Sequence, residues 1–381
     1  MNYEIDFLPI NEEQNGDAIL LRWQENARYK VMVIDGGTKQ TGEKIVSHIK
    51  KYYNTSTVDY LVSTHPTKNN TTGLSIVLQK LNVLEFWTHR PWNYTQKFMK
   101  YIDSGKLTKA DLKKRLEKSF AYVKPLEKIA NEKGIPIYEP FQGAKIGIFE
   151  VLSPSKRWYL DELISYSSLK LPLLNKLLPS SIKALPFKNK SSNELVPHSS
   201  QKLLPSTNIV VKTVKKIKET ISNWIEETLH IETLKENVKT THNNESSVIL
   251  YAEINNRGVL LTASAGTKAL KKAYKYKKEI SENLKFIQIP NHGNKNNVSP
   301  SILNKILGKK AQEDINKVAY ISVSRNSSTL PHQSVINAFI RRGCDVLETK
   351  GSTQWYYTGT PDREDFSESD ILKFKTKFQE D

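Results

Sequence analysis

Short apolar runs separated by polar turns predict a chain in which strands and helices alternate. Strand-like runs in the first half lie at residues 3–10, 19–23, 30–34, 60–62 and 83–87. Between the third and fourth runs, Ile45 and Ile49 recur at helical spacing within residues 42–53. Strands that alternate with helices predict an α/β fold, in which polar side chains just after a strand usually carry the chemistry.

Apolar runs typical of strands continue almost to the end of the chain, with one interruption. They lie at residues 134–138, 144–152, 258–262, 284–290, 318–324, 343–347 and 355–357. Residues 107–131 form a long lysine-rich stretch with an apolar stripe, and residues 334–342 follow a Leu-Pro-His turn. Both stretches predict helices.

The interruption spans residues 157–241. Its first part is rich in Leu, Lys and Pro and then in Ser and Asn, whereas Val210–Ile225 has apolar residues at helical spacing. We interpret residues 157–241 as an inserted, basic and partly helical segment. The apolar stripe of its helix packs on its own domain, binds a partner protein or lies on a membrane. The charged tail, 361–381, is expected to be a surface helix at 369–378 or disordered.

The most informative stretch is Asp59–Leu74. A short apolar strand opens it, a polar turn follows, and helical spacing begins at Gly73. The polar residues of this turn are His65, Thr67, Lys68, Asn69 and Asn70.

This turn resembles the signature of the metallo-β-lactamase fold family, Thr-His-x-His-x-Asp-His followed by a Gly-Gly-Leu-like helix start. His65 takes the first histidine position. Thr67, Asn69 and Asn70 stand where the family has its second histidine, its aspartate and its last histidine. The spacing of the motif is kept, but three of its four metal-ligand positions hold a different residue from the family's.

Other segments resemble the ComEC-type nuclease subgroup of the same family. Its Gly-Asp-Ala hairpin and its Leu-Ile-Asp-Gly-Gly strand end have counterparts here that contain Asp17 and Asp35. Ser264 stands where that subgroup has an aspartate that bridges two metals, and Asn291-His292 stands where it has His-His.

The resemblance covers residues 1–153 and 243–357. It implies one domain over residues 1–381, built as a four-layer αββα sandwich with the helical insertion described above.

These replacements remove residues that metal-dependent catalysis would need. Two-metal hydrolysis needs several carboxylate or imidazole ligands around the ions, and Asn and Ser are weak zinc ligands. His65 and His292, with Asp17 or Asp35, are too few to hold zinc. We therefore expect no cofactor and no metal-dependent catalysis, with His65 and His292 as the remaining candidates for a metal.

Charge points to polyanions as partners. The chain has 57 Lys and Arg against 40 Asp and Glu, a net charge of +17 and a pI near 9.5. This balance favours nucleic acid, nucleotides or an acidic protein, although it also fits a lysine-rich composition bias. The candidate polyanion contacts are Lys68, Arg90, Trp92, Lys212, Lys215 and Lys216.

The cysteine content and the lengths of the apolar runs indicate where in the cell the protein is expected. Cys344 is the only cysteine, which excludes an intrachain disulfide, and its apolar strand predicts a buried thiol. Residues 1–6 lack the basic and apolar regions of a signal peptide, and no apolar run reaches the ~20 residues of a membrane helix. We expect a cytoplasmic protein.

Three functions follow from these observations. The first is a catalytically degenerate family member that binds nucleic acid or a protein partner, for instance in a bacterial defence or DNA-processing assembly. The second is a nuclease or phosphodiesterase with Zn²⁺ or Mn²⁺ in a rearranged site, which requires Asp17, Asp35, His65, His292 or His332 to converge. The third is a nucleotide sensor with a closed pocket lined by Lys68, Asn70, Arg90 and Asn291.

Overall fold

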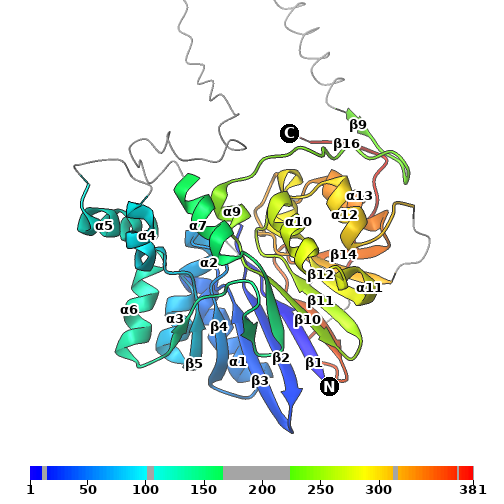
Figure 1. The fold of residues 1–381 in the computed structure, drawn as a ribbon. Coiled ribbons are helices and arrows are strands. Elements are labelled where there is room, and N and C mark those ends of the chain that lie inside the picture. Colours follow the sequence, from blue (N-terminus) through cyan, green and yellow to red (C-terminus); the bar gives the residue numbers. More distant parts are fainter. Residues whose placement is uncertain (11–14, 101–106, 166–223, 312–315, 367–368, 381) are drawn as a thin grey trace, which may run out of the picture.

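Two seven-stranded sheets lie face to face, and helices cover their outer faces (Figure 1). The computed structural model describes residues 1–10, 15–100, 107–165, 224–311, 316–366 and 369–380. No described helix has the length and apolar character needed to cross a membrane.

The first sheet comes from the N-terminal part of the chain, and one late strand closes its edge. In sheet order its strands are β15 (Gln354–Thr358), β1 (Tyr3–Phe7), β2 (Ile19–Glu25), β3 (Arg28–Ile34), β4 (Thr57–Val62), β5 (Asn82–Trp87) and β6 (Ile137–Tyr138). From β3 to β6 the strands run parallel, so their carboxyl ends meet at one edge.

The second sheet has a similar plan. In sheet order its strands are β14 (Cys344–Glu348), β13 (Lys317–Ile321), β12 (Leu284–Gln288), β11 (Arg257–Leu261), β10 (Ile249–Ile254), β8 (Phe149–Ser153) and β7 (Lys145–Ile146). From β11 to β14 the strands are parallel. A separate two-stranded sheet pairs β9 (Trp224–Glu226) with β16 (Lys377–Gln379).

The α-helices are mostly short. They are α1 (Lys39–Tyr52), α2 (Lys68–Thr71), α3 (Leu74–Lys80), α4 (Thr95–Met99), α5 (Lys109–Ser119), α6 (Lys124–Glu132), α7 (Lys156–Ser165), α9 (His242–Glu245), α10 (Thr267–Tyr276), α11 (Ile280–Asn283), α12 (Pro300–Ile306) and α13 (Gln333–Ile340). Single 3₁₀ turns are η1 (Pro91–Tyr94), η3 (Pro290–Gly293) and η4 (Lys295–Asn297).

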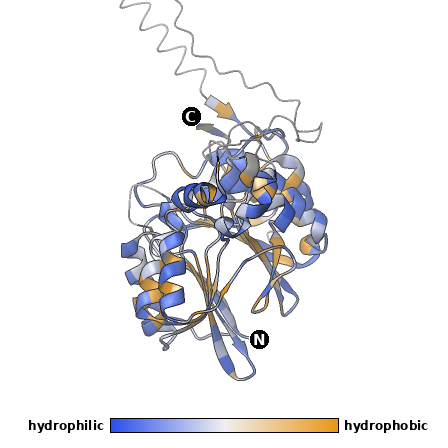
Figure 2. Cartoon of the chain, turned by 60° about the vertical axis from the view of Figure 1, so that its left-hand side comes forward, coloured by the Kyte–Doolittle hydropathy of each residue, from blue (hydrophilic) through white to orange (hydrophobic). Residues whose placement is uncertain are grey.

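Three apolar layers hold these elements together and confirm the predicted αββα sandwich. One cluster joins the first sheet to α1, α3 and α6, a second fills the space between the sheets, and a third joins the second sheet to α10, α12 and α13. The position of β2 explains why successive residues of this strand are apolar. Ile19 and Leu21 face the other sheet while Leu20 faces the helices, so both faces of the strand are buried. In Figure 2 the apolar colour accordingly gathers along the strands and the polar colour on the helices.

A fourth apolar cluster forms a helical cap made of η1, α4, α5 and α7. Its members are Trp92, Tyr94, Phe98, Leu107, Leu112, Leu116, Phe120, Val123, Tyr159 and Leu163. The cap lies on the side of the molecule where α2 follows β4 (Figure 1).

Two expected elements are each divided in the structure. The helix expected at 107–131 is two helices, because the chain turns at Phe120–Val123 and Pro125 starts α6, a position that proline favours. The strand expected at 144–152 is a hairpin of β7 and β8. Gly147 lies in its turn with a positive φ of 57°.

The expected helix at 369–378 is wrong. The tail is extended and ends in β16, which pairs with β9. Its lysines at 373, 375 and 377 alternate with Leu372, Phe374, Thr376 and Phe378, a period of two that is typical of a strand. Trp224 and Ile225, expected at the end of the insertion helix, lie in β9 instead. The rest of that helix, with Lys212, Lys215 and Lys216, lies outside the described residues.

Arg363 anchors the tail to the first sheet. Its guanidinium donates to Asp6 Oδ1 at 2.7 Å and to Glu4 Oε2 at 2.6 Å, and both carboxylates are fully buried on β1. Burial alone would raise the pKa of Asp6, but His48 and Arg363 lower that pKa below its ordinary value. The guanidinium also lies 4.5 Å from the ring centre of Trp355, as a cation–π contact.

We expect Arg363→Ala to lower the free energy of unfolding by about 3 kcal/mol, because it removes the guanidinium that both buried carboxylates share and leaves only Arg22 beside Glu4 and His48 beside Asp6. Urea unfolding followed by circular dichroism measures this change. Lys51→Ala is the matched control, since the Lys51–Asp365 pair is about half exposed and should contribute less than about 1 kcal/mol. Equal effects of the two substitutions would contradict this account of the anchor.

Candidate functional site

The site residues expected from the sequence come from the carboxyl ends of parallel strands in both sheets. Asp35 follows β3, His65 and Asn70 follow β4, and His292 follows β12. All four are buried, with exposed fractions of 0% for Asp35, 6% for His65, 2% for Asn70 and 8% for His292. The topology therefore brings the family positions together in the interior of the molecule.

Asn70 joins the two carboxylates of this site. Its side-chain nitrogen donates to Asp35 Oδ2 at 2.9 Å and to Asp17 Oδ2 at 3.1 Å. The amide thus supplies both of its protons to carboxylates that would otherwise repel each other. The backbone carbonyl of Asn70 also accepts from Gly36 N at 2.6 Å, which ties the turn to the end of β3.

Gly36 explains the Asp-Gly-Gly end of β3. A Cβ on Gly36 would lie 2.5 Å from Leu74 N, and a Cβ on Gly73 would lie 1.9 Å from Gly36 O. Only glycine permits this close approach of the strand end to the start of α3. The two glycines therefore hold Asp35 and Asn70 in register.

Gln288 was missed by the sequence reasoning and links the two sheets. From the end of β12, its Nε2 donates to Asp17 Oδ1 at 3.0 Å. Its Oε1 accepts from the backbone nitrogens of Thr262 at 3.1 Å and Ala263 at 2.8 Å, just past β11. A polar residue at the end of the apolar run 284–289 was the available signal.

The Asp35 carboxyl group has an unusually high pKa. Burial and the negative charge of Asp17 raise its pKa to about 8, against three hydrogen bonds that act in the opposite direction. The donors are Thr64 N at 2.8 Å, the Thr64 hydroxyl and Asn70.

His65 is held as a neutral ring between two hydroxyls. Thr64 Oγ1 lies 3.0 Å from His65 Nδ1 on one side of the ring. Thr67 Oγ1 lies 3.3 Å from His65 Nε2 on the other side. Burial lowers the pKa of His65 to about 4 although Asp17 acts in the opposite direction.

The remaining residues of the polar turn lie at its rim. The Thr67 hydroxyl donates to Asn70 Oδ1 at 3.1 Å, and Asn69 Nδ2 donates to Asn15 O at 3.2 Å. Lys68 is exposed at the start of α2. Thr67 therefore orients the Asn70 amide, and Asn69 fixes the hairpin that precedes Asp17.

On the second sheet, Asn291 and His292 also bond within the protein, whereas the buried Ser264 hydroxyl has no hydrogen-bond partner among the described residues. Asn291 Nδ2 donates to Asn297 Oδ1 at 2.9 Å, and Asn297 in turn donates to the backbone carbonyl of Ser264 at 2.9 Å. His292 Nδ1 lies 2.8 Å from Ser322 O. His332 lies farther along, with Nδ1 3.3 Å from Gly293 O.

The backbone at these strand ends adopts a conformation that side chains rarely favour. Asp35, Ala263, Asn291 and His292 have positive φ values of 54°, 48°, 45° and 59°. Such strained residues cluster at active sites.

The donor set does not fit the metal pair that the resemblance implies. Protons of Asn70 point at both carboxylates, where a cation would have to bind. Within the residues that the structure describes, no three His, Cys, Asp or Glu side chains come together in a way that could hold a metal ion. Asp17 and Asp35 share the Asn70 amide, but the hydrolase hypothesis requires a convergent set of metal ligands, and none is found among the described residues.

The helical cap closes over His65. The cavity between them has a volume of about 10 Å³, roughly the space of one water molecule. His65 and Thr88 of the sheet line it on one side, and Phe120, Val123 and Tyr159 of the cap line it on the other. A substrate therefore has no room at this end of the site.

Two residues that were expected to contact a polyanion, Trp92 and Arg90, bond within the protein instead. Trp92 is 2% exposed in the cap, and its Nε1 donates to Glu127 Oε1 at 3.2 Å, so the expectation that it contacts a polyanion is wrong. Arg90 donates to Ile137 O at 3.2 Å and lies 3.8 Å from Glu127. With Asn70 and Asn291 also engaged, the pocket required by the sensor hypothesis does not form from these side chains.

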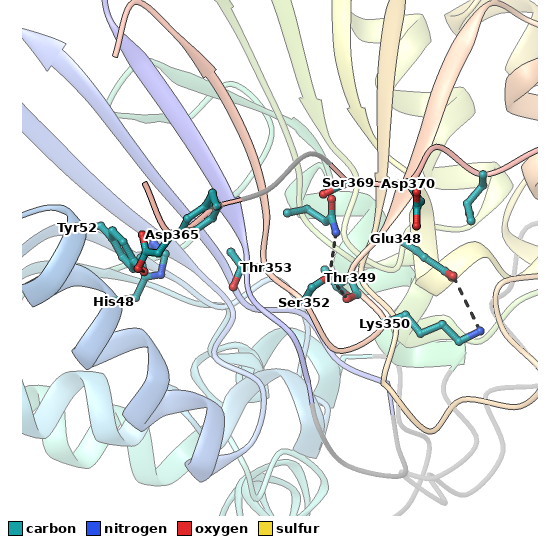
Figure 3. A pocket seen from close by; sticks show the side chains of 13 residues that line it. His48, Tyr52, Glu348, Thr349, Lys350, Ser352, Thr353, Asp365, Ser369 and Asp370 are labelled. Carbon is teal, nitrogen blue, oxygen red and sulfur yellow. Dashed lines mark hydrogen bonds and ion pairs between the residues drawn. The ribbon is translucent and has the colours of Figure 1, made fainter. Parts of the chain in front are cut away.

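A larger pocket of about 500 Å³ lies away from these strand ends (Figure 3). Tyr52 of α1 donates to Asp365 Oδ2 at 2.7 Å on one side, and Glu348 lies 3.9 Å from Lys350 on the other. Burial raises the pKa of Glu348. Because Asp370 adds a third carboxylate, the lining is unsuited to the phosphates of a nucleotide.

Comparisons with known proteins find likeness at the level of structure. No protein-family model matches the chain, and no curated protein matches it. One similar structure is a diphosphatase from the PhnP family, with 9% identity, a TM-score of 0.39, and coverage of 94% of this chain and 98% of the diphosphatase. Another is a long-form RNase Z from yeast, with 12% identity, a TM-score of 0.39, and coverage of 93% of this chain and 42% of the RNase Z. Both proteins have the metallo-β-lactamase fold.

We expect the stability of the protein to fall by about 2 kcal/mol between about pH 6.5 and pH 8.5 because of Asp35. The folded carboxyl holds its proton up to about pH 8, while the unfolded one loses it near pH 3.8, so rising pH favours unfolding. His65 acts in the opposite sense only below pH 6.5, where its unfolded ring binds a proton.

Urea unfolding at the two pH values tests this expectation. Asp35→Asn should remove the fall in stability, whereas Asp345→Asn, on β14 and outside the network, should retain it. A fall of equal size in Asp35→Asn and the wild type would show that another group causes it.

Proposed function

We propose that this chain is a catalytically degenerate protein of the metallo-β-lactamase fold, related to the ComEC-type subgroup, that acts as a binding or scaffold subunit. Its partner is nucleic acid or another protein. The single observation that carries this proposal is the Asn70 amide, which bonds Asp17 and Asp35 at the place where catalysis would need a cation.

Metal-dependent hydrolysis needs a cation with an open coordination position and a path for the substrate. The cluster formed by Asp17, Asp35, His65 and Asn70, here called the polar cluster, meets neither requirement. Asp35 and Asn70 are at most 2% exposed, and the neighbouring cavity beside His65 holds about one water. The positive φ values at Asp35 and His292 are compatible with descent from an active site, where such backbone conformations cluster.

The binding role follows from charge and architecture. A net charge of +17 favours polyanionic partners. Residues 157–241 interrupt the sandwich between β8 and β10 and remain the sequence-based candidate for a protein partner. A place in a bacterial defence or DNA-processing assembly is the setting that fits a non-catalytic subunit of this kind.

Elemental analysis tests the proposal on protein purified without a metal-affinity tag. We expect far less than one transition-metal ion per chain, no degradation of DNA or RNA with added Mn²⁺ or Zn²⁺, and no change in Tm with EDTA. The reason is that hydrogen bonds, with no metal, hold Asp17 and Asp35.

One or two ions per chain, together with cleavage that His65→Ala or His292→Ala abolishes, would overturn the proposal. Thr329→Ala is the matched control for these substitutions, since Thr329 is exposed and lies outside the polar cluster. Cleavage that survives in both histidine variants would show that a contaminating nuclease is responsible.

A further inference from the structure

We propose that the outer face of α5 is a binding site for the phosphate backbone of nucleic acid. This inference rests on the binding role proposed above and names the surface and the class of partner. It concerns a part of the helical cap that none of the expected polyanion contacts includes.

Positive charge is concentrated in the part of the cap that contains α4 and α5. Residues 95–100 and 107–123 hold seven Lys or Arg and two Asp or Glu, so less than a tenth of the chain carries five of its seventeen net charges. On α5 itself the exposed cations are Lys109, Lys113, Lys114, Arg115 and Lys118. A rigid helix that presents several cations to solvent is the electrostatic footprint expected of a nucleic-acid surface.

The two acidic residues of α5 are already engaged. Asp111 accepts from the backbone and the hydroxyl of Thr108 in a capping box, which lowers its pKa. Glu117 lies 3.1 Å from Lys124 of the next helix. Asp111 also lies close enough to Lys114 and Arg115 for their charges to lower its pKa, so two carboxylates face the five cations of α5 and leave the helix with a net positive charge.

The lysine-rich surface around the tail differs in this respect. The tail lysine Lys377 lies 2.8 Å from Glu226, and Lys350 lies 3.9 Å from Glu348. Their groove of about 530 Å³ is also lined by Glu380. Cations on that surface have acidic neighbours, so α5 is the stronger attractor for a polyanion.

Burial of the apolar face of α5 favours nucleic acid over a membrane. Leu112 and Leu116 are fully buried in the cap cluster, so they cannot insert into lipid as an interfacial helix requires. Tyr122, which is 44% exposed in the turn after α5, adds an aromatic surface of the kind on which bases stack.

Fluorescence anisotropy with labelled single-stranded DNA, duplex DNA and single-stranded RNA tests the site on the full chain. The variant Lys113→Gln/Lys114→Gln/Lys118→Gln keeps side chains that favour helix and removes three positive charges. We expect its affinity to fall at least about tenfold at low salt. The slope of log K against log salt should fall by about two to three, because each lost phosphate contact removes about 0.7 to 0.9.

The control variant is Lys268→Gln/Lys271→Gln/Lys275→Gln on α10. It removes the same charge from three exposed lysines of a helix on the other sheet, and its affinity should stay within about threefold of the wild type. Circular dichroism and Tm establish that both variants are folded.

Three outcomes would overturn the α5 site: no binding of any probe at about 50 mM salt, equal losses in the two variants, or loss of binding to phosphatidylserine vesicles without a loss for nucleic acid. Cleavage of the labelled probes with Mn²⁺ would instead overturn the non-catalytic function and leave the comparison of the two variants valid.

Discussion

The contact between the Asn70 amide and two buried carboxylates is the constraint on which the centre of this molecule depends. Asp17 and Asp35 come from different connections of the first sheet and are at most 2% exposed. Two such charges without a partner would cost several kcal/mol each. The Asn70 amide, the raised pKa of Asp35 and the Gln288 side chain together remove that cost. Because Gln288 belongs to the second sheet, the network also fixes how the two sheets meet.

The helical cap covers the same residues whose hydrogen bonds are made within the protein. The helical cap packs Phe120 and Tyr159 over His65, and the ring nitrogens of His65 face the hydroxyls of Thr64 and Thr67. An active site would need a solvent path and an unsatisfied ligand at this place. Here both requirements are absent among the described residues, while the strained backbone of a site persists. The same cap that packs over His65 also presents the basic outer face of α5 to solvent.

Much of the fold could be predicted from the sequence because it depends on local pattern. Apolar runs and helical spacing located most strands and helices, and the polar turn after β4 pointed to the right strand ends. The misses depend on contacts between distant residues. Gln288 looks like an ordinary strand end until Asp17 lies 3.0 Å away, and Trp92 looks like a base-stacking residue until Glu127 and the cap bury it. The tail was misassigned because its charge suggested a surface helix, although its alternation of lysine and apolar residues already had the period of a strand.

The position of β15 next to β1 has a consequence for synthesis on the ribosome. The first strand of the chain to emerge carries Glu4 and Asp6, whose partners Trp355 and Arg363 are made some 350 residues later. Until then, one edge of β1 is unpaired and its two carboxylates lack a cation that the finished fold supplies. At a translation rate of about 5–20 residues per second, that interval lasts tens of seconds or longer. Throughout this interval the unpaired edge of β1 can pair with other chains.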